Sequence, residues 1–189
     1  MHKKTSKVYT SESTFVKTAN YYYIKDKEMQ SSLEQKGYGE ESQKKFFLNP
    51  FESLYLLYCE KLKLSKGKKK INFDSLMQTC IKYDEEIMTK FLIYRDLRTR
   101  GYTVKDGFGF GFDFRVYERG HFGEKGAKYL IFGLNEGRTE KIGQLQKKVQ
   151  QITQMGKEPI IAVIERRGEI IYYKMSKMNF LQNKEKINL

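Results

Sequence analysis

The sequence pattern changes near Gly101, and this change limits the folds that the chain can adopt. Before Gly101, apolar residues recur at the three- and four-residue spacing of amphipathic helices. After it, short aromatic and β-branched segments alternate with polar residues, as in 112–117, which is typical of strands. Helices followed by a strand-rich part predict an α+β protein. We therefore expect a small helical or mixed N-terminal domain over residues 1–85 and an α/β C-terminal domain with a mixed sheet over residues 86–189.

Helix-start signals and apolar spacing predict the individual elements. Residues 49–52 supply a capping asparagine, a proline in the first turn and a glutamate at the third helical position. We expect the helix that starts there to bury Leu54, Leu57 and Tyr58. The expected helices cover residues 49–62, 73–83, 84–100 and 139–155. The expected strands cover residues 21–24, 102–105, 112–117, 129–132, 159–165 and 170–175.

The chain carries a large positive charge. Thirty-six Lys and Arg residues stand against 23 Asp and Glu, which gives a net charge of +13 and a pI near 9.5. An excess of this size indicates a polyanionic partner such as nucleic acid. Basic residues are densest at Lys61–Lys70, which we expect to be a loop between two helices. Such a loop is either simply solvated or contacts phosphates through its lysines, and the sequence leaves both interpretations open.

Targeting signals and disulfide patterns are missing from the sequence. Cys59 and Cys80 make no disulfide framework, which favours a reducing compartment. No apolar run approaches the roughly 18 to 20 residues of a membrane span, and the N-terminus lacks the apolar core of a signal peptide. We therefore expect a cytoplasmic protein with no membrane partner.

Motifs for metals and cofactors are missing as well. The two cysteines are far apart, and only His2 and His121 could join them, so we expect no metal site and no cofactor. The glycines of residues 107–111 precede a strand, whereas a dinucleotide-binding loop opens a helix. We expect these glycines to allow a tight turn with the backbone packed close to a neighbour.

The segment Lys90–Gly120 contains three motifs. They are Asp96-Leu97-Arg98-Thr99-Arg100-Gly101 at an expected helix end, the run Gly101–Lys105, and Asp113-Phe114 through Tyr117. In these motifs the segment resembles the corresponding part of archaeal tRNA-splicing endonucleases. Weaker similarity covers Gly37–Gly39, Asn49–Tyr58 and Ile160–Tyr173. On these residues the chain is identified as a member of that family.

The resemblance implies a particular chemistry. These enzymes cleave RNA without metal, by attack of a 2′-hydroxyl on the adjacent phosphate, and leave a 2′,3′-cyclic phosphate and a 5′-hydroxyl. The step needs a base, an acid and a cation, for which the family uses a tyrosine, a histidine and a lysine. Tyr117 matches the tyrosine and Lys157 the lysine. Gly126 stands at the position of the histidine, and His121 lies several residues too early.

A second departure agrees with the first. Gln150 stands where the family carries an arginine that grips the bulged RNA. The two losses imply a structural, non-catalytic subunit that pairs with a catalytic endonuclease subunit, in a heterotetramer that processes precursor tRNA. We predict as RNA-binding residues Arg98, Arg100, Lys68, Lys69 and Lys70.

Two alternatives remain open. The first is a self-sufficient nuclease, in a homo-oligomer, that uses Tyr117, His121 and Lys157. The second is a plain basic RNA-binding or ribosome-associated protein with no nuclease ancestry. The second is the weaker, because charge alone does not account for the motifs within Lys90–Gly120.

The resemblance also implies two assembly features. The family pairs its last strands tail to tail, and Ile170–Met175 offers an apolar edge for such pairing. The family also inserts an acidic loop into a basic cleft of a neighbouring subunit. The matching loop, Glu165–Glu169, carries Arg166 and Arg167 at its centre, so the cleft that it enters is left open.

Overall fold

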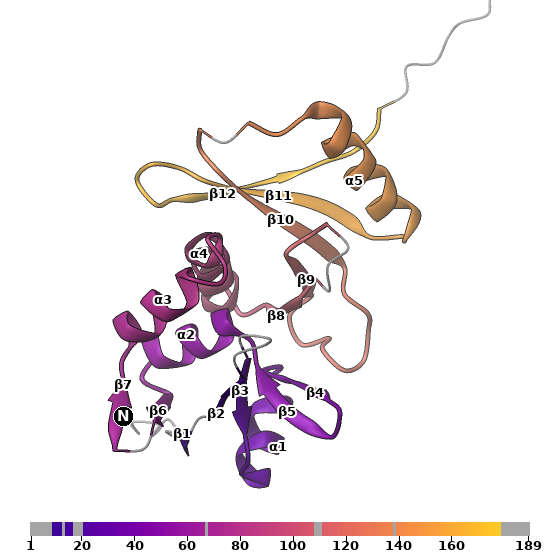
Figure 1. Ribbon diagram of the computed structural model, residues 1–189. Coiled ribbons are helices and arrows are strands. Elements are labelled where there is room, and N and C mark those ends of the chain that lie inside the picture. Colours follow the sequence, from indigo (N-terminus) through magenta and orange to yellow (C-terminus); the bar gives the residue numbers. More distant parts are fainter. Residues whose placement is uncertain are drawn as a thin grey trace, which may run out of the picture.

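The computed structural model describes residues 9–12, 14–16, 21–66, 68–107, 111–137 and 139–178. Its architecture is α+β, as the sequence pattern predicts (Figure 1). The described strands form three sheets, of four, three and five strands. The first two belong to the N-terminal half of the chain and the third to the C-terminal half.

The four-stranded sheet has the order β2-β3-β5-β4, with antiparallel neighbours. Its strands are β2 (Thr14–Val16), β3 (Tyr21–Ile24), β4 (Glu40–Ser42) and β5 (Lys45–Leu48). Helix α1 (Lys27–Gln35) follows β3. It starts at Asp26, whose carboxylate accepts a hydrogen bond from the Met29 N–H at 2.7 Å. Alternate strand residues, with Met29 and Leu33 of α1, enter the hydrophobic core.

The three-stranded sheet corrects one expectation. It consists of β1 (Tyr9–Glu12), β6 (Leu62–Lys66) and β7 (Lys69–Ile71), in the order β1-β6-β7. The basic segment 61–70 was expected as a loop between helices, and that prediction is wrong. Leu62 and Leu64 are each only 2% exposed while Lys63 between them is exposed, which is the two-residue period of a strand.

Three helices link the two halves. They are α2 (Pro50–Tyr58), α3 (Phe73–Ile81) and α4 (Ile87–Thr99). The predicted start of α2 is confirmed, since the Asn49 N–H donates to Glu52 Oε2 at 2.9 Å. The helix ends earlier than expected because the chain turns into β6, and the predicted burial of Tyr58 is wrong, since its side chain is 53% exposed.

The C-terminal sheet has the order β12-β11-β10-β9-β8. Its strands are β8 (Thr103–Asp106), β9 (Phe114–Tyr117), β10 (Tyr129–Asn135), β11 (Glu158–Ile164) and β12 (Ile170–Lys174). The pair β10–β11 is parallel and the other pairs are antiparallel, so the sheet is mixed as expected. Helix α5 (Ile142–Gln154) connects the two parallel strands.

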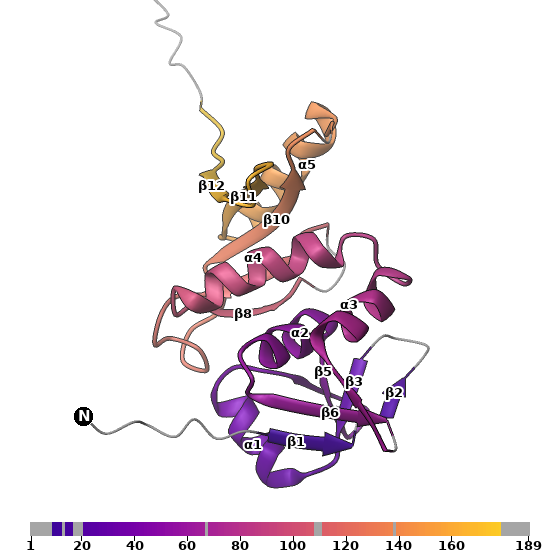
Figure 2. The same ribbon diagram turned by 90° about the vertical axis from the view of Figure 1, so that its left-hand side faces the viewer.

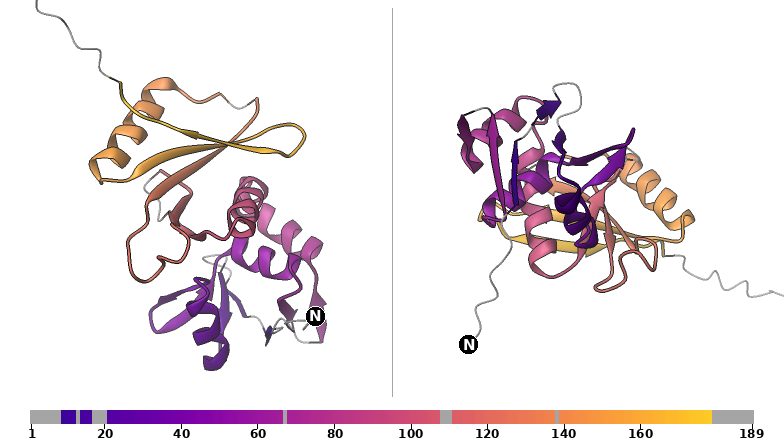
Figure 3. Two further views of the ribbon diagram at one scale, coloured as in Figure 1. Left: turned by 180° about the vertical axis from the view of Figure 1, so that it is seen from behind. Right: turned by 90° about the horizontal axis from the view of Figure 1, so that it is seen from below.

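Helices α4 and α5 cover opposite faces of this sheet (Figures 1 and 2). Ile131 of β10 packs in the core that contains α4, whereas its neighbours Leu130 and Phe132 pack in a second core with Ile152 of α5. The turn between β11 and β12 projects beyond the sheet (Figures 1 and 3).

The glycine run makes a close backbone approach at Gly107. A Cβ atom on Gly107 would lie 2.1 Å from the Phe112 carbonyl oxygen, so no larger residue fits there. Residues 108–110 lie outside the described part of the chain. Within the residues that the structure describes, no helix is long and apolar enough to cross a membrane.

Candidate active-site pocket

Tyr117, Gly126 and Lys157 line one pocket of about 340 Å³. The topology explains why they meet. Tyr117 is the last residue of β9, which runs antiparallel to β10, and Gly126 precedes β10. Lys157 precedes β11, which runs parallel to β10. The end of β9 and the starts of β10 and β11 therefore share one edge of the sheet.

Gly126 lies directly beside the Lys157 ammonium group. A Cβ atom built on Gly126 would lie 3.3 Å from Lys157 Nζ. The φ of Gly126 is not in the left-handed region, so the backbone conformation there does not require glycine. A side chain at residue 126 would therefore lie next to the Lys157 ammonium group, which would have to shift slightly to admit it.

The pocket is positively charged. Among the described residues that line it, Arg115 and Lys157 are cations and none is a carboxylate. Arg115 is positioned by a hydrogen bond from Nε to the Asp106 carbonyl at 2.7 Å and by an ion pair of Nη2 with Glu40 Oε1 at 3.2 Å. The sequence analysis missed Arg115, although it lies two residues before Tyr117 on the same strand and hence on the same face.

His121 is not among the residues that line this pocket. It lies in the loop after β9, where its N–H donates to the Glu118 carbonyl and its own carbonyl accepts from Lys125. The neighbouring ring of Phe122 packs edge-on against Tyr117, with centroids 5.0 Å apart. Nδ1 of His121 is buried without a hydrogen-bond partner among the described residues. The structure thus brings Tyr117 and Lys157 together and leaves His121 outside.

The two arginines predicted to bind RNA differ in their surroundings. The Arg98 guanidinium lies 4.0 Å from the centroid of the Tyr38 ring and donates to the Lys36 carbonyl at 2.9 Å, so it already holds the helix end against the N-terminal half. Arg100 is more exposed and pairs with Asp96 at 2.7 Å.

The three predicted lysines lie away from the pocket. Lys68, Lys69 and Lys70 are exposed on the β6–β7 hairpin. That hairpin and the end of β9 lie on opposite sides of the molecule in Figure 1. The lysines therefore form a separate basic surface.

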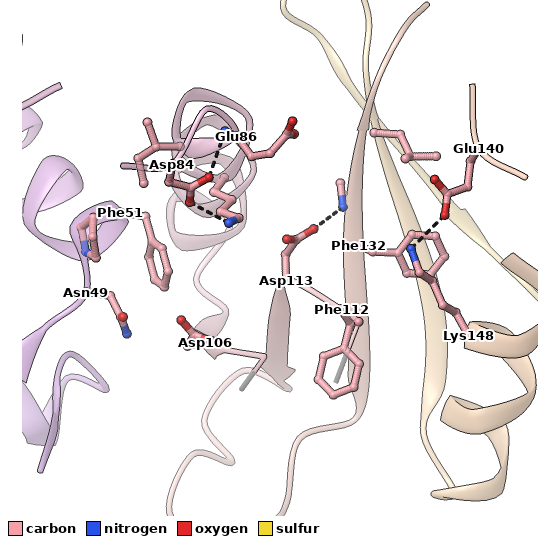
Figure 4. A pocket seen from close by; sticks show the side chains of 16 residues that line it. Asn49, Phe51, Asp84, Glu86, Asp106, Phe112, Asp113, Phe132, Glu140 and Lys148 are labelled. Atoms are coloured by element: carbon pink, nitrogen blue, oxygen red, sulfur yellow. Dashed lines mark hydrogen bonds and ion pairs between the residues drawn. The ribbon is translucent and has the colours of Figure 1, made fainter. Parts of the chain in front are cut away.

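A larger pocket of about 520 Å³ lies between α4, the start of α2 and β10 (Figure 4). Its carboxylates are Asp84, Glu86, Asp106, Asp113 and Glu140. Asp113 accepts a hydrogen bond from the Gly133 N–H at 2.7 Å, and burial raises its pKa. Lys90 pairs with Asp84 at 2.7 Å and Lys148 with Glu140 at 2.9 Å. Five carboxylates against two lysines disfavour a phosphate here, so the charge of the Tyr117 pocket suits RNA better than the charge of this pocket.

Lys105, in the run that resembles endonucleases, is buried between the two halves. It is 6% exposed, its Nζ donates to the Gly39 carbonyl, and burial lowers its pKa. The nearby Glu52 carboxylate is fully buried and accepts from the N–H groups of Gly39 at 3.0 Å and Asn49 at 2.9 Å. Burial raises the pKa of Glu52 to about 7, although Lys105 and the two N–H groups oppose that shift. This lysine has a structural role in joining the two halves.

The pocket places a tyrosine and two cations at one edge of the C-terminal sheet, so its charge suits a phosphate. Comparison with known families gives the class of protein. The family model "tRNA intron endonuclease, N-terminal domain" matches residues 20–77, and "tRNA intron endonuclease, catalytic C-terminal domain" matches residues 87–172.

Curated relatives carry the same assignment. The tRNA-splicing endonuclease of Methanococcus maripaludis is 35% identical over 153 residues, which cover 80% of this chain and 86% of that protein. That of Thermococcus gammatolerans is 34% identical over 136 residues, 72% of this chain and 80% of that protein. That of Pyrococcus horikoshii is 29% identical over 159 residues, 84% of this chain and 92% of that protein. The chain belongs to the tRNA intron endonuclease family.

Proposed function

We propose that this chain is the structural subunit of a tRNA-splicing endonuclease and that a catalytic subunit of the same family completes a heterotetramer with it. The observation that carries the proposal is Gly126, which stands beside Lys157 Nζ where the reaction needs a proton donor. The assembly cleaves precursor tRNA without metal and leaves 2′,3′-cyclic phosphate and 5′-hydroxyl ends.

The residues present supply only part of the reaction. Tyr117 is the base that takes the 2′-hydroxyl proton, and Lys157 stabilises the negative charge on the pentavalent phosphate. No side chain at Gly126 protonates the leaving 5′-oxygen. A positioned proton donor increases the reaction rate by about 10²- to 10⁴-fold, so this pocket by itself cleaves RNA very slowly.

The chain contributes RNA-binding charge to the assembly. Lys68, Lys69 and Lys70 are exposed and face solvent on one hairpin, so they contact backbone phosphates without reading sequence. Of the two predicted arginines, Arg100 is better placed to bind RNA, because the Arg98 side chain already contacts the Tyr38 ring and the Lys36 carbonyl.

The test is cleavage of an intron-bearing precursor tRNA by the purified chain in EDTA. The chain alone leaves the RNA intact, and adding the catalytic subunit restores excision with cyclic phosphate ends. Efficient excision by the chain alone contradicts the structural role.

The alternative is a self-sufficient enzyme in which His121 is the acid. One observation favours it, namely the buried Nδ1 of His121 without a partner among the described residues, four positions after Tyr117. Under this alternative, His121→Ala lowers cleavage by about 10² to 10⁴. An unchanged rate for His121→Ala in the complete assembly rules it out.

A further inference from the structure

The four-stranded N-terminal sheet carries two aromatic rings on the face opposite its core. Tyr23 of β3 and Phe47 of β5 pair directly across neighbouring strands, with ring centroids 5.8 Å apart and a tilt of 49°. Their neighbours in both strands are buried, so the alternation of strand side chains turns these two rings to the other face. The buried neighbours are Tyr22, Ile24, Phe46 and Leu48.

The two rings are outside the hydrophobic core. Both side chains are half-buried, and neither belongs to the core clusters that the described residues form. A cross-strand aromatic pair of this kind brings two apolar rings side by side on one face of the sheet.

Lysines flank the aromatic pair. Lys45 lies two residues before Phe47 and so shares its face, and its Nζ lies 5.9 Å from the centroid of the Tyr23 ring. The β4–β5 turn consists of Gln43 and Lys44, with φ of 49° and 60°, which is the two-residue hairpin turn that brings Lys44 and Lys45 to one tip. Both lysines are exposed.

The aromatic face continues toward the candidate active-site pocket. Glu40 of β4 pairs opposite Phe47 and therefore points to the same face. Its carboxylate is bound to Arg115 Nη2 at 3.2 Å, and Arg115 lines the pocket of Tyr117 and Lys157. One ion pair thus connects the two surfaces, and it neutralises a carboxylate on the face of the rings.

We propose that this face binds unpaired bases of RNA, which stack on Tyr23 and Phe47 while Lys44 and Lys45 contact the neighbouring phosphates. Every base has a π-face, so stacking on aromatic side chains of a sheet binds single strands with little sequence preference, and nearby cations attract the backbone. The inference rests on the proposed function in one respect, that precursor tRNA is the RNA in question.

The experiment compares RNA binding by variants of the full chain. Fluorescence anisotropy measures the Kd for a short single-stranded oligouridylate and for an RNA duplex of equal length. Tyr23→Ala and Phe47→Ala each weaken binding of the single strand by about 5- to 100-fold, and binding of the duplex stays unchanged. Tyr23→Phe retains binding, because stacking needs the ring and not the hydroxyl. Tyr83→Ala is the matched control, since it removes a ring that is 51% exposed at the α3–α4 turn.

A second measurement keeps the proposal falsifiable if an alanine variant unfolds. The unaltered chain is cross-linked by light to 4-thiouridine RNA, and the modified peptides are identified by mass spectrometry. Cross-links at residues 21–25 and 45–48 are expected. Their absence, with RNA bound, overturns the proposal.

Other outcomes separate this proposal from the proposed function. Native alanine variants that bind single strands like the unaltered chain contradict the stacking face alone. Variants that bind RNA normally but lose the partner subunit contradict it too, because the face is then a protein-docking surface. If the unaltered chain binds neither RNA, by itself or in the assembly, the RNA-binding part of the proposed function fails as well.

Discussion

The ammonium group of Lys105 donates a hydrogen bond to the backbone carbonyl of Gly39, 66 residues earlier in the chain. This contact joins the first strand of the C-terminal sheet to the turn before β4. Gly39 has φ of +69°, and a Cβ atom there would lie 2.3 Å from the Phe46 ring. Part of the segment that resembles endonucleases therefore holds the two halves together.

Replacing Lys105 by methionine lowers the free energy of unfolding by about 1 to 3 kcal/mol, because it leaves the buried Gly39 carbonyl without its hydrogen-bond donor. Urea unfolding followed by circular dichroism measures the change. Lys125→Met, at an exposed loop position, is the control and changes stability by less than about 0.5 kcal/mol. Equal effects of the two substitutions contradict the structural role of Lys105.

Glu52 makes the fold less stable at neutral pH than at acid pH. Its folded pKa of about 7 exceeds the ordinary value, so the folded state binds more protons between the two values. The contribution of Glu52 is complete below about pH 4.5 and is lost as pH rises through 7, a change on the order of 1–3 kcal/mol.

The measurement is urea unfolding of the native chain and Glu52→Gln at pH 5 and pH 8. The variant lacks the titrating carboxyl group, so the native-minus-variant difference in the free energy of unfolding falls as pH rises. The contributions of the other titrating groups are the same in both proteins and cancel in this difference. A difference that is constant or rises with pH contradicts the raised pKa.

Residue patterns predicted most of the C-terminal sheet, because its elements follow local rules. The alternation in residues 112–117 and the β-branched segment 159–165 each gave a strand close to the observed one. The meeting of Tyr117, Gly126 and Lys157 could be anticipated only through the resemblance, since it depends on the parallel pairing of β10 with β11.

The N-terminal sheets were mostly missed. Their strands are three to five residues long, and β4 and β7 are polar, so local periodicity is weak. The run 61–70 looks like a loop by charge, and only the burial of Leu62 and Leu64 against the helices makes it a hairpin. The aromatic face of Tyr23 and Phe47 depends on strand register, which sequence spacing does not reveal.

Gly126→His restores the missing proton donor. The imidazole enters the pocket beside Lys157, whose flexible ammonium end can shift from the 3.3 Å approach. In an assembly whose catalytic partner carries an inactivating substitution, cleavage rises about 10²- to 10⁴-fold over the unaltered chain. Gel analysis of labelled precursor tRNA measures the rate.

Two variants control for this gain. Gly126→Ala adds the Cβ atom without the imidazole and produces no cleavage. Gly126→His with Tyr117→Phe keeps the imidazole but lacks the base, and its activity returns to background. A folded Gly126→His chain without any gain contradicts the assignment of Gly126 to the acid position.

Replacing Lys68, Lys69 and Lys70 together by alanine reduces the salt dependence of RNA binding. Each lost phosphate contact lowers the slope of log K against log salt by about 0.7 to 0.9, so the triple variant loses about 2 to 3 units. The control replaces Lys141, Lys147 and Lys177, which are equally charged and exposed. If both triple variants change the slope alike, only net charge matters and the hairpin is no binding surface.

The most direct measurement is cleavage of precursor tRNA in EDTA by the purified chain, with and without a catalytic subunit. The structural-subunit account predicts intact RNA with the chain alone, and excision with 2′,3′-cyclic phosphate ends once the catalytic subunit is added. Circular dichroism of the same sample establishes that the chain is folded when it shows no cleavage by itself. Excision by the chain alone, at a rate that the catalytic subunit does not increase, would contradict the account.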